Sequence, residues 1–426
     1  MLKSRLCIAF FAFAVGCAPA QKPLTDYVNP MLGTATLWDS VDLGFKPTKR
    51  TWGAEVFPGS SLPNAMVQVS PVTKFHSGAG YQYEDSVIYG FTHTNKGHWN
   101  LCHIPLLPVT GTPTPGDYCS PFSHERESAA PGYYQVFLDR YGVDAQLSST
   151  LRCAFHKYTY PAGAAASLLA DLQRSNEHVR AWDIRKEGDN VFAGWQQTGE
   201  KMYFYAVANR PVTGIEPVVE GDREVRIVRF GEGDGALELR IGFSFVSEKN
   251  ARENLEAEML GKSFAEVRSE ATATWNDLLG RIRVEGGTER EKGLFYSSLY
   301  RSFLWPALRS DVNGEFTDVD GKVINPGFRY YTGPSYWDDY RNKLILLGML
   351  APDVAADVIS SDTDKGEKRG GFMPTFFHGD HASAFVAGTY LRGNRGFDVN
   401  RAYNLVLRNA TVQGPSRPWL DEYIAK

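Results

Sequence analysis

The sequence of 426 residues has no long run of charge of one sign. Its net charge is −4, and nowhere do five or six like charges follow one another. This distribution argues against a nucleic-acid partner and against a polybasic segment that binds membranes. The sequence also lacks the glycine-rich phosphate loop, the GxSxG nucleophile elbow, the GxGxxG turn and the HExxH zinc helix. Function classes that depend on one of these motifs are therefore excluded.

Cysteine is scarce as well. Of the 5 cysteines, Cys7 and Cys17 belong to the N-terminal leader, and Cys102, Cys119 and Cys153 remain. Their number is odd, and no spacing among them matches a zinc site or a disulfide framework. One pair could form a disulfide, but the pattern favours small, buried hydrophobic residues.

The first twenty residues differ from the rest of the chain. Two basic residues precede an apolar run at 6–15, and small residues follow. This pattern is typical of a secretory signal, and the run is too short for a stable membrane anchor. Cleavage after Ala20 and lipid attachment at Cys17 both fit. We predict a signal peptide at 1–20 and an exported protein, which is periplasmic, an outer-membrane lipoprotein or secreted.

The period of the apolar residues divides the mature chain. In LELRIGFSFVS (237–247), apolar residues alternate with polar or small ones, which indicates a half-buried strand. Many such short strands, with glycine, proline and aspartate between them, predict a β-sandwich over 22–248. At 249–282 the apolar steps become three and four residues, which predicts a helical linker broken near Gly261.

Residues 283–426 continue the helical pattern. Long loops rich in glycine and aromatic residues separate the helices, and this arrangement predicts the first part of an (α/α)₆ toroid. The fold class is therefore mixed: a β-sandwich, a helical linker and an incomplete toroid. The expected helices span about 289–304, 337–350, 353–361, 381–392 and 398–412.

Aromatic residues make up 13% of the chain, which suits large cores and also proteins that stack rings against sugars. In SYWDDYRNK (335–343), Ser335 and Asp338 have the spacing of a capping box, so Asp338 could simply satisfy backbone N–H groups. Tyr336 and Trp337 precede it, however, and an aromatic platform beside a carboxylate is one way to hold a sugar. Both interpretations remain open.

Asp380 shows the same ambiguity in HGDHASAFVAG (378–388). It fits the N-cap of a helix that begins at His381, and Gly379 allows a close approach. Capping is the favoured interpretation from the sequence alone. His378 and His381 form an HxxH pair, which is a weak metal pattern without a carboxylate on the same helix face.

A third cluster is FTHTNKGHWNLCH (91–103), which contains His93, His98 and His103 beside Trp99. Polar and aromatic residues in a loop-like stretch invite interpretation as a site. For any one of these histidines, a structural role is the favoured interpretation.

Taken together, these stretches resemble one family. The sequence stretches YVNPMLGT, VFPGSSLPNAMVQVSP, YGFTHTNKGHW and FSHERESAAPGYYQVFL resemble, in that order, the N-terminal β-domain of glycoside hydrolase family 92. YWDDYR, GGFMPTFFHGDHASAF and YLRGNRGFDVNRAY resemble the first part of its catalytic domain. Several long motifs in a fixed order cover nearly all of the mature chain, which makes the resemblance specific.

The resemblance implies an exo-acting, inverting, calcium-dependent α-mannosidase whose partner is a mannose-containing glycan held between the two domains. Asp338 matches an aspartate that binds sugar hydroxyls. The GDH segment of Gly379, Asp380 and His381 matches a substrate-binding segment, and Trp99 matches a tryptophan that the β-domain lends to the pocket. On this basis HGDHASAFVAG is both a helix cap and a binding site.

The stretches that carry the resemblance do not include the residues that would perform the reaction. The family's general acid, its base and most calcium ligands are expected in motifs beyond Lys426, so we assign no catalytic or metal-binding residue here. We expect the chain to be the N-terminal portion of the enzyme, with Leu405 and Val406 exposed and the isolated chain inactive. A non-catalytic carbohydrate-binding protein is the alternative. A metal hydrolase that uses His378, His381 and the histidines near Trp99 is the weakest alternative, because calcium prefers oxygen ligands and a zinc site should show tighter spacing.

Overall fold

The computed structural model describes residues 22–36, 44–46, 56–96, 99–233, 235–375, 379–414, 419 and 421–422. The side chains of residues 95, 96, 99 and 100 are not described. The predicted signal peptide at 1–20, with Cys17, therefore lies outside the described residues, and so do His98, His378 and Lys426.

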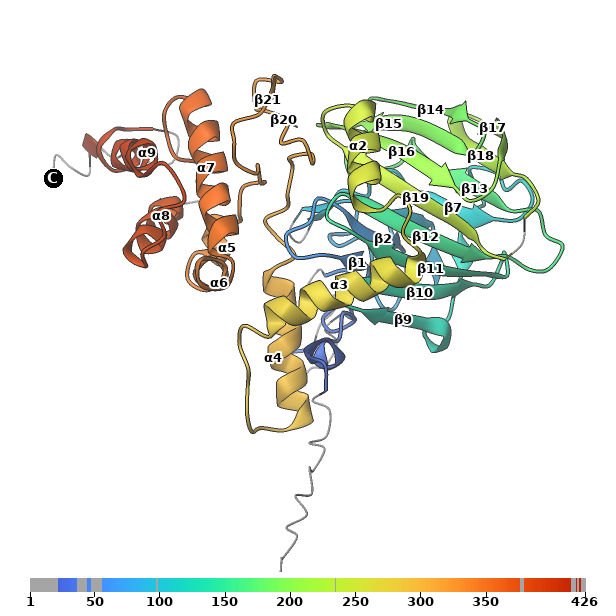
Figure 1. Ribbon diagram of the computed structural model, residues 1–426, viewed down its shortest axis with the longest axis horizontal. Helices are drawn as coiled ribbons and strands as arrows, with labels where there is room; N and C mark the ends of the chain where they lie inside the picture. Colours follow the sequence, from blue (N-terminus) through green and yellow to red (C-terminus); the bar gives the residue numbers. More distant parts are fainter. Residues whose placement is uncertain are drawn as a thin grey trace, which may run out of the picture.

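Two antiparallel sheets packed face to face form the N-terminal half of the molecule (Figure 1). The smaller sheet has the order β1(Ser60–Ser61), β2(Gln68–Val72), β4(Gly90–Thr92), β7(Leu106–Val109), β13(Ser167–Ala170), β18(Arg223–Phe230), β17(Val212–Glu220). The larger sheet has the order β14(Ala181–Gly188), β15(Val191–Gln197), β16(Lys201–Ala208), β19(Leu237–Ser244), β12(Cys153–Thr159), β11(Val143–Ser149), β10(Tyr133–Leu138), β9(Glu127–Ala130). Minor pairs are β3(Val87–Ile88) with β8(Ser120–Pro121), and β5(Asn95–Lys96) with β6(Trp99–Asn100).

Alternating burial along the strands produces the sandwich core. In β16 every second residue is buried, and Leu237, Leu239 and Ile241 of β19 are fully buried. Side chains of a strand point to opposite faces in turn, so these residues meet the inner face of the other sheet. The predicted half-buried strand near 237–247 is therefore confirmed.

Two helices cover the outer face of the larger sheet. α2(Glu248–Glu258) lies against β16 and β19, and α3(Phe264–Leu279) lies against β11 and β12. Gly242 permits the approach of α2, because a Cβ atom there would be only 2.1 Å from the carbonyl oxygen of Ala251. A break at Gly261, with φ +90°, separates the two helices as expected.

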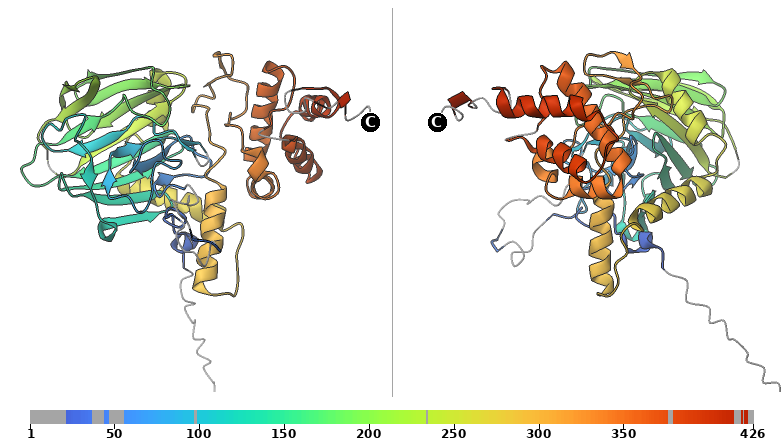
Figure 2. Two further views of the ribbon diagram at one scale, coloured as in Figure 1. Left: turned by 180° about the vertical axis from the view of Figure 1, so that it is seen from behind. Right: turned by 60° about the vertical axis from the view of Figure 1, so that its left-hand side comes forward.

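The chain then passes from the sandwich to a helical region. α3 and α4(Glu289–Ser302) pack together and against the short 3-10 helix η1(Leu24–Tyr27). An extended segment with the hairpin β20(Phe316–Thr317) and β21(Val323–Ile324) follows, and it runs between the sandwich and the remaining helices (Figures 1 and 2). Those helices are α5(Tyr336–Asp339), α6(Lys343–Leu350), α7(Pro352–Lys368), α8(His381–Leu391) and α9(Val399–Thr411).

Two of the expected helices differ from the structure. The one expected at 337–350 is divided into α5 and α6, because the Asn342 side chain accepts from Lys343 N at 2.6 Å and starts a new helix. α7 continues seven residues past the expected end at 361. The hydroxyls of Ser360, Ser361 and Thr363 donate to carbonyls four residues earlier, so the helix itself satisfies these polar groups.

The mixed fold is confirmed: sandwich sheets, then helices. The expectation that the helices belong to a toroid stays a prediction, as do the domain boundaries at 22–248, 249–282 and 283–426. Within the described ranges, no single helix is long and apolar enough to cross a membrane. α6 and α7 taken together have the length and apolar composition of a membrane span, but the chain bends by 120° at their junction.

Candidate functional site

The rings of three residues meet where α5 approaches α8. The His381 ring stacks on Tyr340, with centroids 4.2 Å apart and planes 17° from parallel. Trp337 meets the same imidazole edge-on, with centroids 5.6 Å apart. Trp337 is 44% exposed, so this cluster presents an aromatic surface to solvent.

His381 has an unused polar atom. Its Nε2 is buried and has no hydrogen-bond partner among the described residues. Gly379, whose φ is +80°, lies beside this ring. A Cβ atom on Gly379 would be 3.5 Å from Nε2 of His381. Buried polar groups normally have a partner, so an orphaned one at an aromatic surface points to a ligand.

Asp380 is the N-cap of α8. Its carboxylate accepts from the backbone N of Ser383 at 3.3 Å, from the Ser383 hydroxyl and from Nδ2 of Asn409 on α9 at 3.2 Å. The predicted cap therefore exists. The positive end of the helix dipole and these donors favour a carboxylate at this position.

Asp338 does not cap α5. The Ser335 hydroxyl donates to the Asp338 carboxylate at 2.8 Å, and Ser335 makes no side-chain cap. The capping-box interpretation of this pair is therefore wrong. Asp338 is exposed and follows Trp337 directly, so its carboxylate is free to accept hydrogen bonds from a ligand at the aromatic surface.

The neighbouring carboxylate has a different role. Asp339 accepts from Lys343 Nζ at 3.1 Å and ties α5 to the first turn of α6. Burial lowers the pKa of Lys343, and the Asp339 carboxylate opposes this effect. Of two adjacent aspartates, one is therefore held inside and the other faces solvent.

The cluster at residues 91–103, in the sandwich, divides into buried histidines and Trp99. His93 and His103 are buried in the sandwich, and burial lowers the pKa of His93 to about 3. His103 lies between the hydroxyls of Thr94 and Thr198, each 2.9 Å from a ring nitrogen. These two histidines are structural, as favoured above. Trp99 lies in β6, but its side chain is outside the described residues, so its approach to Asp338 stays a prediction.

The described residues do not supply a metal centre. Among them, no group of three or more histidine, cysteine, aspartate or glutamate side chains is placed to hold an ion. Calcium takes six to eight oxygen ligands, and Asp338 and Asp380 are two carboxylates with other partners. These residues therefore do not fit a calcium site.

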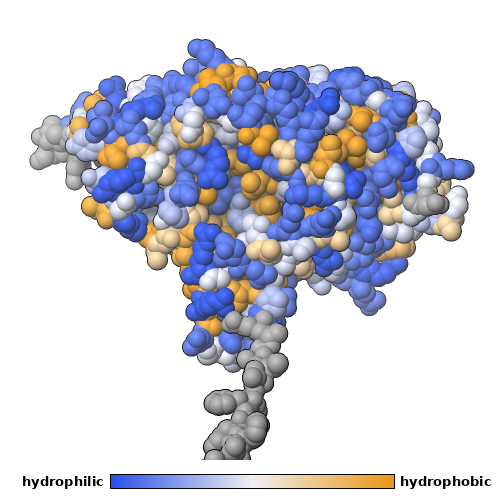
Figure 3. Space-filling model, in the orientation of Figure 1, coloured by the Kyte–Doolittle hydropathy of each residue, from blue (hydrophilic) through white to orange (hydrophobic). Residues whose placement is uncertain are grey.

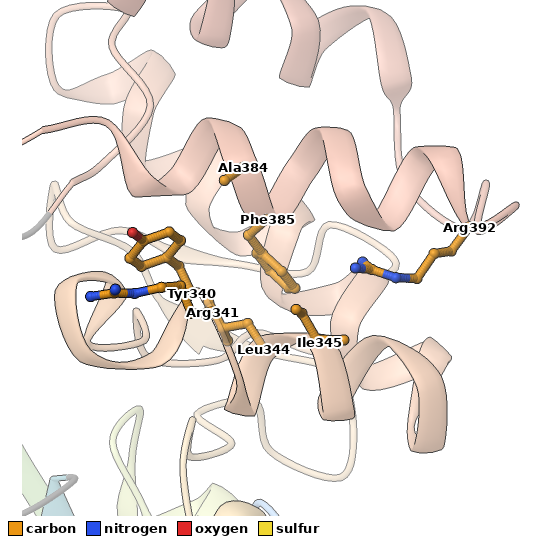
Figure 4. A pocket seen from close by; sticks show the side chains of 7 residues that line it. All are labelled: Tyr340, Arg341, Leu344, Ile345, Ala384, Phe385 and Arg392. Carbon is orange, nitrogen blue, oxygen red and sulfur yellow. The ribbon is translucent and has the colours of Figure 1, made fainter.

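A cavity of about 250 Å³ adjoins the aromatic surface between α6 and α8. Tyr340 lies at one end, Phe385 in the middle and Arg392 at the other end (Figure 4). Tyr340 is shared, since it also stacks on His381. The cavity therefore begins at the surface that carries the predicted site residues.

The structure brings Asp380 and His381 together and links them through two rings to the α5 turn that carries Asp338. The sequence interpretation missed Tyr340 and Asn409. Tyr340 belongs to the quoted YWDDYR motif and could have been included. No local signal pointed to Asn409, because its contact with Asp380 depends on the packing of α9. Chemically, the arrangement can accept hydrogen bonds from hydroxyl groups and stack against an apolar ring face.

Comparisons with known protein families agree with this organisation. Residues 27–253 match the Glycosyl hydrolase family 92 N-terminal domain, and residues 250–426 match the Glycosyl hydrolase family 92 catalytic domain. The two matches meet at the start of α2, where strands give way to helices.

Solved structures give the same result. A family 92 α-mannosidase from Bacteroides thetaiotaomicron is 26% identical, covers 94% of this chain and superposes with a TM-score of 0.85. A structure of that α-mannosidase in complex with mannoimidazole also matches, with a TM-score of 0.82. An inverting mannosidase of the family from the same organism is 23% identical, with a TM-score of 0.83, and shows the shared fold.

A curated relative, described as an uncharacterized secreted glycosidase of Arthroderma benhamiae, is 24% identical over 91% of this chain. The chain spans 52% of that protein and 58% of the bacterial α-mannosidase.

Proposed function

The chain belongs to glycosyl hydrolase family 92, and from this premise we propose that the whole protein is an exo-acting, inverting α-mannosidase. In this proposal Asp338, Asp380 and His381 bind the terminal mannose of a glycan, and Gly379 lets the sugar approach. We further propose that Trp99 of the sandwich contributes to the same sugar pocket. The resemblance of the quoted motifs and the mannose mimic bound by a 26% identical relative support the substrate class.

The observation that carries the proposal is the buried, unpartnered Nε2 of His381. The ring is fixed by stacking on Tyr340 and edge contact with Trp337. A sugar hydroxyl would give Nε2 the partner that the protein does not provide. An exposed indole and a carboxylate beside it supply the other two elements of sugar recognition, which are stacking and charge-assisted hydrogen bonds.

We assign both aspartates to binding rather than to the chemical step. An inverting glycosidase needs an acid and a base on opposite faces of the sugar, roughly 6.5–9.5 Å apart. Asp380 is already held by Ser383 and Asn409 as a helix cap, which suits a fixed acceptor. No general acid or base is assigned among the described residues.

The only support for calcium dependence is the resemblance of the chain to the family. Because the described residues do not form a calcium site, no step of binding is attributed to the ion. Export is supported by the secretory pattern of residues 1–20 and by the curated relative, which is described as secreted.

The test is the affinity of Asp338→Asn for mannoimidazole, measured by titration calorimetry in the full-length protein. Hydrogen bonds to a charged group contribute about 1.5–3 kcal/mol, so we expect affinity to fall by roughly 10- to 100-fold. The melting temperature should stay almost unchanged, since Asp338 is exposed and caps no helix. Asp353→Asn, at an exposed aspartate at the start of α7, is the matched control and should leave the affinity unchanged.

Equal affinity for wild type and Asp338→Asn would refute the assignment of Asp338. Turnover of an aryl α-mannoside by the 426-residue chain, lost in Asp338→Asn, would instead give Asp338 a catalytic role. Binding without turnover by the full-length protein would favour the non-catalytic carbohydrate-binding alternative.

A further inference from the structure

α7 carries a buried ion pair, Asp362 with Lys365, that has no role in the proposed function. We propose that Asp362 and Lys365 of α7 are positioning residues for Asp338, acting through the hydroxyl of Tyr336. The inference rests on the proposed role of Asp338 in sugar binding. It adds a supporting contact to α5 from a different helix, α7.

The contacts form one continuous chain. Asp362 is fully buried, and one carboxylate oxygen accepts from the Tyr336 hydroxyl. The other oxygen accepts from Lys365 Nζ at 2.8 Å, and the same ammonium donates to the carbonyl of Tyr331 at 2.9 Å. Ser361 adds a second tie, since its hydroxyl accepts from Tyr331 N at 3.0 Å. α7 is therefore hydrogen-bonded both to the start of α5 and to the extended segment that leads to it.

α5 needs such a support. It is a single turn of four residues, its N-cap residue Ser335 makes no capping bond, and an isolated turn is unstable by itself. Its direction must therefore come from tertiary contacts. Tyr336 is the buried anchor, and Asp338 is only two residues further along the turn. A change in the position of Tyr336 would be transmitted directly to the Asp338 carboxylate.

The location of Tyr336 connects this support with the rest of the site. Its ring lies 6.3 Å from that of Phe385 on α8. Burial raises the pKa of the Tyr336 hydroxyl well above its usual range, and the nearby carboxylates of Asp362 and Asp380 add to this effect. The hydroxyl is thus a permanent donor, and it lies near enough to Asp380, the N-cap of α8, to feel its charge.

A buried ion pair is a weak source of stability, because removing charges from water offsets most of their attraction. A pair of well-packed apolar residues could fill the same space. What the apolar pair could not provide is a directional acceptor for Tyr336 and a directional donor for Tyr331. The function of Asp362 and Lys365 is therefore orientation, and a site that binds hydroxyls requires orientation to within a fraction of an ångström.

The experiment compares two buried tyrosines in the full-length protein. Tyr336→Phe removes the hydroxyl that contacts Asp362. Tyr300→Phe, in α4, removes a buried hydroxyl that has no partner among the described residues and is the matched control. Each variant is measured for mannoimidazole affinity by calorimetry and for amide hydrogen exchange over residues 336–343.

We expect Tyr336→Phe to weaken binding by on the order of tenfold and to speed exchange across 336–343 by at least as much, since small misplacements of binding groups have large effects. Tyr300→Phe should change neither. Asp362→Asn keeps an acceptor for Tyr336 but weakens the pairing with Lys365, so it should give an intermediate loss. It also serves as the test variant if Tyr336→Phe does not fold.

Unchanged affinity and exchange in both test variants would overturn the inference. Faster exchange with unchanged affinity would also overturn it, since the support would then not act on the sugar. If wild type itself does not bind mannoimidazole, the proposed function fails and the inference fails with it. The exchange data would then show separately whether Asp362 orders α5.

Discussion

The unpartnered nitrogen of His381 lets a binding role be separated from a structural role. The ring is held by its stack on Tyr340, which phenylalanine could keep, while Nε2 makes no hydrogen bond with any residue that the structure describes. A buried polar atom without a partner costs about 1–3 kcal/mol. We therefore expect His381→Phe to melt at the same temperature as wild type or higher.

The same substitution should weaken mannoimidazole binding by roughly tenfold, because one hydrogen bond to the sugar is lost. Calorimetry and thermal denaturation of one preparation provide both measurements. A lower melting temperature together with unchanged affinity would mean that His381 is only a packing residue.

What the sequence predicts at this scale is local. The cap at Asp380 is predictable because its partner, Ser383, is three residues away in the same motif. The stack of Tyr340 on His381 and the bond from Asn409 to Asp380 join residues that are 29 or more positions apart. Such contacts depend on how helices pack, which the spacing of residues in one helix does not determine.

For the helices, too, the sequence predicts features that depend on nearby residues and misses those that depend on tertiary packing. The sequence predicts the start of α8 from its aspartate cap. It does not predict the end of α7, because a polar stretch after Ser360 is typical of a loop. Here that stretch stays helical because Asp362 and Lys365 have buried partners. A polar face can belong to the core when every group on it is satisfied.

The contact between α2 and the larger sheet depends on one glycine. A Cβ atom at Gly242 would overlap the carbonyl oxygen of Ala251, so Gly242→Ala should displace α2. We expect a loss of about 1–3 kcal/mol in unfolding free energy, as for other overpacked sites. Gly214→Ala in β17 is the control, because nothing lies within 4 Å of its Cβ position, and it should be neutral or slightly stabilising. Equal effects in denaturant unfolding would contradict this account.

A buried carboxylate joins α2 to the segment after α4 and should make stability depend on pH. Asp311 accepts from Ser244, Asn254 and Asn250 at 2.6–2.9 Å. Burial raises its pKa from 3.8 to about 6, although these hydrogen bonds lower it. A raised pKa in the folded state favours folding at low pH, and this contribution is lost as pH rises through about 6.

Between pH 4 and pH 7.5, wild type should therefore lose roughly 2 kcal/mol of stability relative to Asp311→Asn, which does not titrate there. Urea unfolding of both proteins at the two pH values measures this difference. The variant can be less stable at every pH, since its amide donates where the carboxylate accepts. Only the change with pH tests the claim, and parallel pH profiles would refute it.

On the scale of the whole molecule, the helical region leaves apolar surface uncovered. α8 carries apolar or small residues on all sides, which is typical of a helix surrounded by protein. Leu391 of α8 is nevertheless 80% exposed, and Met349 of α6 is 60% exposed. The expected exposure of Leu405 is wrong, because it is buried beside Gly366 of α7. Val406 is partly buried against the core, and Tyr403 and Leu407 are the exposed large apolar residues of α9 instead.

Apolar side chains reach the surface at several places in Figure 3, including the side where α8 and α9 lie in Figure 1. Exposed apolar surface favours association. We therefore expect the 426-residue chain to self-associate at micromolar concentration and the double variant Leu391→Glu with Met349→Lys to remain monomeric in light scattering. Val219→Glu, which changes a 64% exposed residue of β17, should leave association unchanged. If it suppresses association equally, net charge rather than the exposed Leu391 and Met349 side chains governs self-association, because added charge alone keeps chains apart.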